Sequence, residues 1–130
     1  MRVYVAGASA EIERAEALIA RLRGAGVEVT SDWPENVRRA GAANVGLTHE
    51  VRLAAARACS LGVRRSDWLV VLEPKVPTIG AWVEMGIALA HGIDVLWVGE
   101  GACTVFESLA TSTVNSDDEA FRFLAEDGHD

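Results

Sequence analysis

A single acidic residue interrupts the most apolar stretch of the chain. Residues 77–92 read PTIGAWVEMGIALAHG, and Glu84 is the only charged side chain in them. Burying a carboxylate is costly unless it is paired or hydrogen-bonded. In a helix, the residues three and four positions from Glu84 are all uncharged, so the helix itself offers no partner. Glu84 is therefore a candidate functional residue. The alternatives are a partly exposed position or a pairing with an arginine across a subunit contact.

Four other positions carry groups that could contact a ligand near this glutamate. Thr78 is the expected N-cap of the apolar helix, and a helix N-terminus suits an anion because its first N–H groups are unpaired. Residues 7–9 read Gly-Ala-Ser and resemble a phosphate-binding turn, although a plain strand-to-helix turn is the alternative. Tyr4 is either a core residue or one whose hydroxyl reaches the end of its strand. Trp33 either stacks on a base or anchors its loop.

Composition narrows the class of protein and of ligand. The chain has 130 residues, which fits one domain spanning 1–130, and a net charge of −7. This acidic balance argues against a nucleic-acid polymer as partner but leaves room for a mononucleotide, which needs only a few donors. We expect no membrane segment, because no apolar run approaches about 20 residues. Cys59 and Cys103 form no metal or redox spacing, so we expect no metal and no cofactor, and a reducing, cytoplasmic setting.

Alternating strands and helices must position these candidates. The strands expected from short apolar runs are 3–6, 27–30, 68–72, 95–98 and 113–115. The helices expected from 3.6-residue periodicity and capping signals are 10–25, 48–65, 78–91, 105–110 and 117–126. Residues 31–46 contain Pro, Asn and two Gly without periodicity, and we interpret them as a loop.

This alternation predicts an α/β fold. We expect a flavodoxin- or Rossmann-like three-layer sandwich with a five-stranded parallel sheet of order 2-1-3-4-5. Ligands bind such sheets beyond the carboxyl ends of the strands, where the strand order reverses. That point lies between residues 7–9, after the first strand, and residues 73–78, after the third. Glu84 would lie about one and a half turns into the helix that starts there.

Three segments resemble one known family. They are Tyr4-Val-Ala-Gly7, Ser66-Asp67-Trp68-Leu-Val-Val71, and the G-x-x-x-E-hydrophobic-G-x-A pattern from Gly80 to Ala88. All three are similar to segments of the nucleoside 2-deoxyribosyltransferase-like family. That family includes nucleoside and deoxynucleoside 5′-monophosphate N-glycosidases. The resemblance extends over nearly the whole chain, and the segment around Glu84 is its most specific part.

The resemblance implies an activity and a set of roles. Glu84 would be the nucleophile that attacks the anomeric carbon of a nucleoside or its 5′-monophosphate, and Tyr4 would orient it. Family transferases tend to carry an acid at the position of Thr78, whereas monophosphate glycosidases tend to carry a hydroxyl there. The threonine therefore favours hydrolysis of a monophosphate. The phosphate would be bound by the residues of the two turns, and the base by Trp33. The phosphate-binding residues would be Gly7, Ser9, Thr78 and Gly80.

The same resemblance implies an assembly and exposes one departure. Family members usually pair their subunits, so we expect a homo-oligomer, a dimer or larger. The family also carries an aspartate eight residues before the position of Asp67, and this chain has Cys59 there. Another side chain could take over that role, or sugar recognition could differ. The protein could also be a non-catalytic nucleotide-binding or sensor module. An NAD glycohydrolase that uses Glu84 is a further alternative.

Overall fold

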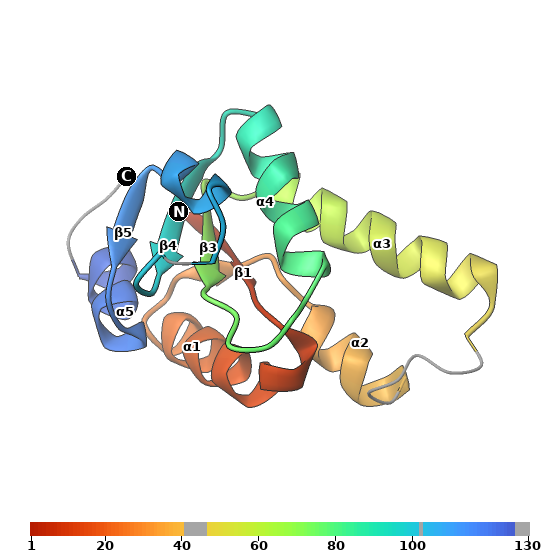
Figure 1. Ribbon diagram of the computed structural model, residues 1–130. Helices are drawn as coiled ribbons and strands as arrows, with labels where there is room; N and C mark the ends of the chain where they lie inside the picture. The colour runs from red at the N-terminus through yellow and green to blue at the C-terminus, as the bar shows by residue number, and fades with distance from the viewer. Residues whose placement is uncertain (41–46, 102, 127–130) are drawn as a thin grey trace.

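A five-stranded parallel sheet forms the centre of the molecule (Figure 1). The structure, a computed structural model, describes residues 1–40, 47–101 and 103–126. The strand order is β2-β1-β3-β4-β5, as predicted. The strands are β1 (Arg2–Ala6), β2 (Glu28–Val29), β3 (Trp68–Leu72), β4 (Asp94–Val98) and β5 (Ser112–Val114). The expected α/β fold is therefore confirmed.

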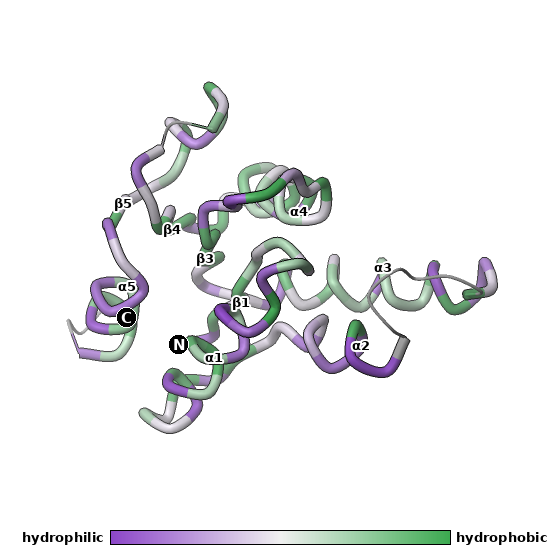
Figure 2. The backbone as a smooth tube through the Cα atoms, turned by 60° about the horizontal axis from the view of Figure 1, so that its bottom comes forward, coloured by the Kyte–Doolittle hydropathy of each residue, from purple (hydrophilic) through white to green (hydrophobic). Residues whose placement is uncertain are grey.

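Helices cover both faces of this sheet and make it the middle of three layers. In Figures 1 and 2, α1 and α5 lie on one face, whereas α3 and α4 lie on the other. The helices are α1 (Ile12–Gly24), α2 (Trp33–Ala40), α3 (His49–Arg64), α4 (Gly80–Ala90) and α5 (Asp117–Ala125), with short 3₁₀ turns η1 (Ser9–Glu11) and η2 (Phe106–Leu109). None of the helices in these ranges is long and apolar enough to cross a membrane.

The central strands explain where the core lies and which ends meet. All five residues of β3 are buried, which fits a strand covered on both faces. In the parallel register Ala6 pairs with Val71, and Val71 pairs with Trp97. Because these strands are parallel, the turn after β1 and the loop after β3 leave the sheet at the same edge. This is the edge where the sequence predicts a ligand.

Two local predictions are wrong. Residues 33–40 form helix α2 rather than part of a loop, and residues 41–46 lie outside the described ranges. Pro34 is tolerated because it lies in the first turn, and Trp33 and Val37 pack inward one turn apart. The N-cap of α4 is Ile79, without a side-chain capping bond, so Thr78 lies one residue outside the expected position. Thr48, in contrast, caps α3 as predicted and accepts a hydrogen bond from the Val51 N–H.

Side chains continue the hydrogen bonding of β1 where β2 ends. Strand β2 pairs only Glu28 and Val29 with β1, so it is shorter than expected. Beyond it, the Val5 N–H donates to Ser31 Oγ at 3.1 Å, and the Trp33 indole N–H donates to the Val5 carbonyl at 2.8 Å. These bonds satisfy both buried backbone groups of Val5. They also fix the start of α2 beside the end of β1.

Candidate active site

Tyr4 and Glu84 form a buried hydrogen-bonded pair between the sheet and α4. The Tyr4 hydroxyl donates to Oε2 of Glu84. Tyr4 is fully buried and Glu84 is 8% exposed. Tyr4 lies two residues before the carboxyl end of β1, and Glu84 lies in the second turn of α4. The fold thus brings together the two residues that the sequence proposes as nucleophile and orienting hydroxyl.

Burial governs the protonation of this pair. Burial raises the pKa of Glu84 to about 7, while the hydrogen bond from Tyr4 acts in the opposite direction. Burial and the neighbouring carboxylate both raise the pKa of Tyr4. Tyr4 therefore stays a neutral donor at every physiological pH. Glu84 changes its charge close to neutrality, which suits a carboxylate that takes part in chemistry.

Cys59 is the third member of the cluster. Its side chain on α3 is half-buried and lies beside Tyr4, with which it interacts. Burial is the main cause that raises the pKa of the Cys59 thiol, so the group stays protonated. Sequence reasoning treated Cys59 as an absent aspartate, whereas its position in the fold gives it a contact with Tyr4.

A cavity of about 730 Å³ lies between α2 and α3 and reaches Cys59. Its volume suits a small-molecule site. The lining is mostly apolar, with Asp32, Asn36 and Arg39 supplying polar groups. Trp33 also lines it, although the indole N–H is already bonded to the Val5 carbonyl. Trp33 is therefore anchored at the start of α2 rather than placed in a free loop.

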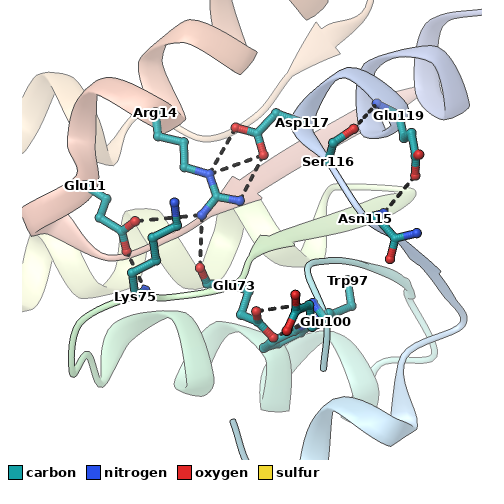
Figure 3. Close-up of polar contacts among 10 residues, drawn as sticks. All are labelled: Glu11, Arg14, Glu73, Lys75, Trp97, Glu100, Asn115, Ser116, Asp117 and Glu119. Atoms are coloured by element: carbon teal, nitrogen blue, oxygen red, sulfur yellow. Dashed lines mark hydrogen bonds and ion pairs between the residues drawn. The ribbon is translucent and has the colours of Figure 1, made fainter. Parts of the chain in front are cut away.

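The two turns proposed for phosphate binding lie side by side at the carboxyl edge of the sheet. The loop after β3 is tied to the start of α1: the Lys75 N–H donates to Oε1 of Glu11 at 2.8 Å, and Arg14 donates to the Glu73 carbonyl at 3.0 Å (Figure 3). Thr78 is half-buried, and Ser9 is exposed.

The first turn of α4 opens onto this edge. The Val83 N–H is bonded to the Ile79 carbonyl, and the N–H groups before it in the helix have no acceptor within α4. A Cβ added to Gly80 would meet no heavy atom within 4 Å. The same test at Gly7 gives only ordinary contacts, to the Leu72 side chain at 3.7 Å. This region therefore offers hydroxyls and N–H groups beside open space, the donors that an anion requires.

A second polar cluster, which sequence reasoning missed, supports this edge. Arg14 pairs with both carboxylate oxygens of Asp117. The Glu73 carboxylate accepts a hydrogen bond from the Trp97 indole at 3.2 Å (Figure 3). It also accepts one from the Gly101 N–H at 2.7 Å. The signal in the sequence was the position of Glu73 directly after a buried strand. These groups form hydrogen bonds and ion pairs with one another, so we assign the cluster a structural role.

Metal ligands are not gathered at this edge. Across residues 1–40, 47–101 and 103–126, no group of three or more His, Cys, Asp and Glu side chains is arranged to hold an ion.

Comparison with solved structures identifies proteins of the same fold. The CMP N-glycosidase BcmB of Clostridium botulinum matches with a TM-score of 0.63 at 17% identity, over 95% of this chain and 98% of that one. The solution structure of BlsM matches with a TM-score of 0.55 at 23% identity, over 95% of this chain and 71% of that one. No family model matches the sequence, and no curated protein sequence is similar to it. These likenesses establish the shared fold.

Proposed function

We propose that this protein cleaves the N-glycosidic bond of a nucleoside 5′-monophosphate, with Glu84 as nucleophile. The observation that carries the proposal is the buried Tyr4–Glu84 hydrogen bond near the carboxyl edge of the sheet. The likeness in fold to a CMP N-glycosidase supports it. So does the resemblance of residues 80–88 to the signature of the nucleoside 2-deoxyribosyltransferase-like family, to which we assign the chain.

The proposed reaction has two steps. The ionised Glu84 attacks the anomeric carbon, the carbon–nitrogen bond breaks, and the base leaves with the bonding electrons and takes up a proton. The resulting glycosyl ester on Glu84 is then hydrolysed by water, which releases the sugar 5-phosphate and restores the carboxylate. This sequence parallels retaining glycoside hydrolysis, with a nitrogen base as the leaving group. Tyr4 would hold Glu84 in the attacking orientation.

The two ends of the substrate would meet chemically different surroundings. The phosphate would bind the N–H groups at the start of α4 and the hydroxyls of Ser9 and Thr78, where an acid at position 78 would repel it. The base would enter the largely apolar cavity beside Trp33 and Cys59. An anchored tryptophan is a suitable wall for a base, because its ring is already held in place.

Cys59 favours a second candidate function. A neutral thiol cannot supply the negative charge that a carboxylate would bring to this position. The protein would then bind a nucleotide at the same edge without cleaving it, as a sensor or a scaffold. The two functions differ in one respect that is easily measured, which is the appearance of free base.

We also propose that the chain assembles into a homo-oligomer through α3. Figure 1 shows α3 extending away from the sheet beyond α4, and Figure 2 shows many hydrophobic residues along it. Ten of its sixteen residues are apolar, counting Gly62, yet only Gly62 and Val63 are buried. A helix of this composition gains stability when a second copy covers it.

Incubation with a panel of nucleosides and 5′-monophosphates tests the reaction, with free base followed by chromatography. We expect base release from at least one monophosphate by the native chain, and none by Glu84→Gln. Glu13→Gln, an exposed glutamate of α1, is the matched control and should behave as the native chain does. Rapid acid quenching followed by mass spectrometry should find the glycosyl ester on the peptide that contains Glu84.

Two outcomes would contradict the proposal. Equal base release by Glu84→Gln and the native chain would exclude Glu84 as nucleophile. Nucleotide binding by calorimetry without base release from any substrate would establish the binding module instead.

A further inference from the structure

Gly62 lets the backbone of α3 approach the ring of Tyr4 closely. A Cβ at this position would lie 2.9 Å from Cε2 of Tyr4 and 2.8 Å from the Thr30 carbonyl oxygen. Distances this short do not occur for real side chains, so any residue with a Cβ would have to displace the ring or the helix. Gly62 lies within α3, and its φ is not positive. The requirement for glycine is therefore one of space rather than of backbone conformation.

The helix cannot easily move away to relieve that contact. The Thr30 hydroxyl donates to the Gly62 carbonyl at 2.8 Å, and Val63 beside it is fully buried in the core. This end of α3 is therefore tied to the segment after β2. Its position against β1 is fixed, and with it the space left for the Tyr4 ring.

Cys59 lies on the same face of α3, three residues before Gly62, as positions i and i+3 of a helix do. Its thiol contacts the hydroxyl of Tyr4, whereas Gly62 contacts the ring edge. One helix thus holds both ends of the side chain that donates to Glu84.

We propose that Gly62 and Cys59 are positioning residues that set the reactivity of Glu84 through Tyr4. The glycine fixes where the ring lies. Because the Tyr4 proton is already donated to Glu84, the neighbouring thiol would donate to the Tyr4 oxygen and so strengthen the hydroxyl as a donor. A hydrogen bond received by the Tyr4 oxygen polarises its own O–H bond, and so strengthens the bond that it donates. The effect on turnover rests on the proposed function, whereas the effect on the Glu84 carboxyl does not.

Few other groups could produce the same effect. Tyr4 from β1 is the group hydrogen-bonded to the Glu84 carboxylate, and it opposes the rise in pKa that burial causes. From α3, Cys59 interacts with both Tyr4 and Glu84, and Asp32 after β2 interacts with Cys59. Disturbing α3 at these two positions should therefore weaken the Tyr4 bond and raise the pKa of Glu84.

Infrared spectroscopy of the carboxyl C=O band tests this directly, with Glu84→Gln subtracted to isolate the Glu84 signal. We expect Gly62→Ala and Cys59→Ala to raise the apparent pKa of Glu84 by about 0.5 or more. Cys59→Ser retains a hydroxyl donor and should return the titration close to that of the native chain. Gly24→Ala, at the end of α1 with no heavy atom within 4 Å of the added Cβ, is the control for the glycine substitution.

A readout of activity complements the titration. Gly62→Ala and Cys59→Ala should lower base release severalfold at pH 6.5 and by less at pH 8.5, because Glu84 must lose its proton to react. Unchanged titration of Glu84 in folded Cys59→Ala protein would overturn the proposal, and so would a Cys59→Ser variant that behaves like Cys59→Ala. If Gly62→Ala does not fold, the two Cys59 variants decide the question. If no chain releases base, the proposed function fails while the titration still tests the role of α3.

Discussion

At the scale of single residues, Glu84 carries the cost of a buried carboxylate. Its pKa is about 7 in the folded protein, against 4.5 for an ordinary glutamate. Between these two values the folded state holds a proton that the unfolded chain has released, so stability falls as pH rises through this window. The difference between the two pKa values corresponds to about 3 kcal/mol once both states are ionised. The native chain is therefore destabilised above neutrality by the residue we assign to catalysis.

Glu84→Gln should remove this penalty. Glutamine stays neutral, and its side-chain oxygen can still accept the Tyr4 hydrogen bond. We expect the variant to be more stable than the native chain by about 2–3 kcal/mol at pH 8, with the gain disappearing near pH 4. Urea unfolding at both pH values measures this, and Glu13→Gln is the exposed control. A stability difference that does not change with pH would show that Glu84 is not the titrating group.

Tyr4→Phe should affect the reaction through the same carboxyl. Without its donor, Glu84 keeps the burial that raises its pKa and loses the hydrogen bond that lowers it. A hydrogen bond to a charged group contributes about 1.5–3 kcal/mol, so base release at pH 7 should fall by about 10- to 100-fold. The pH at which the rate is half-maximal should rise. The phosphate of the substrate also titrates, near pH 6. The variant and the native chain are therefore compared on one substrate, and an unshifted profile would contradict the assigned role.

At the scale of elements, the carboxyl edge of the sheet depends on a tight fit between β4 and the loop after β3. Gly99 follows β4 with a φ of +150°, and an added Cβ would lie 2.5 Å from Cβ of Glu73. Glu73 in turn holds the chain after β4 through the Gly101 N–H. The glycine therefore satisfies both a conformational and a spatial requirement.

Gly99→Ala should destabilise the protein by about 2–4 kcal/mol, since strain and overpacking act together. Gly86→Ala is the matched control: it lies within α4, and its added Cβ meets no heavy atom within 4 Å. Alanine in a helix interior should gain about 0.5–1 kcal/mol over glycine. Thermal unfolding of the two variants measures whether each substitution lowers or raises the stability of the protein. Equal effects would mean that Glu73 yields to the new methyl group.

The elements also show what the sequence could predict. The apolar run 68–72 identified β3 because both faces of that strand are buried. Helix α2 was missed because Pro34 and the glycines after it resemble loop residues, although Trp33 and Val37 have helical spacing. The bonds from Ser31 and Trp33 to Val5 depend on how the fold places a distant strand, so no local pattern predicts them.

In the candidate site too, contacts between residues distant in the sequence could not be predicted from local patterns. The sequence shows that Glu84 has no charged partner on its own helix. The expected strand order also places Glu84 near the carboxyl end of β1. The contacts of Cys59 and Gly62 with Tyr4 join residues more than fifty positions apart. They follow from how α3 packs on the sheet, which periodicity does not determine. The prediction of Thr78 as N-cap was wrong because α4 begins one residue later than expected, which makes Ile79 the capping position.

At the scale of the whole molecule, α3 has a buried carboxyl-terminal end that positions Tyr4 and an apolar first half that is exposed. Its carboxyl-terminal end is buried at Val63 and contacts Tyr4, whereas Val51 and Leu53 in its first half are 49% and 38% exposed. The cavity beside Cys59 is lined by the first two-thirds of this helix, from Val51 to Cys59. A second copy covering α3 would therefore also enclose the cavity in which we place the base.

Sedimentation of the native chain should therefore show a dimer or larger species, and Leu53→Glu should shift it toward the monomer. A charge at this position would have to be buried without a partner when two copies meet, which costs several kcal/mol. Leu109→Glu, at an exposed leucine of η2, is the matched control because it adds the same charge far from α3. If the assembly encloses the cavity, Leu53→Glu should also weaken nucleotide binding while leaving the fold intact. A native chain that sediments as a monomer at micromolar concentration would show that the exposed face of α3 has another purpose.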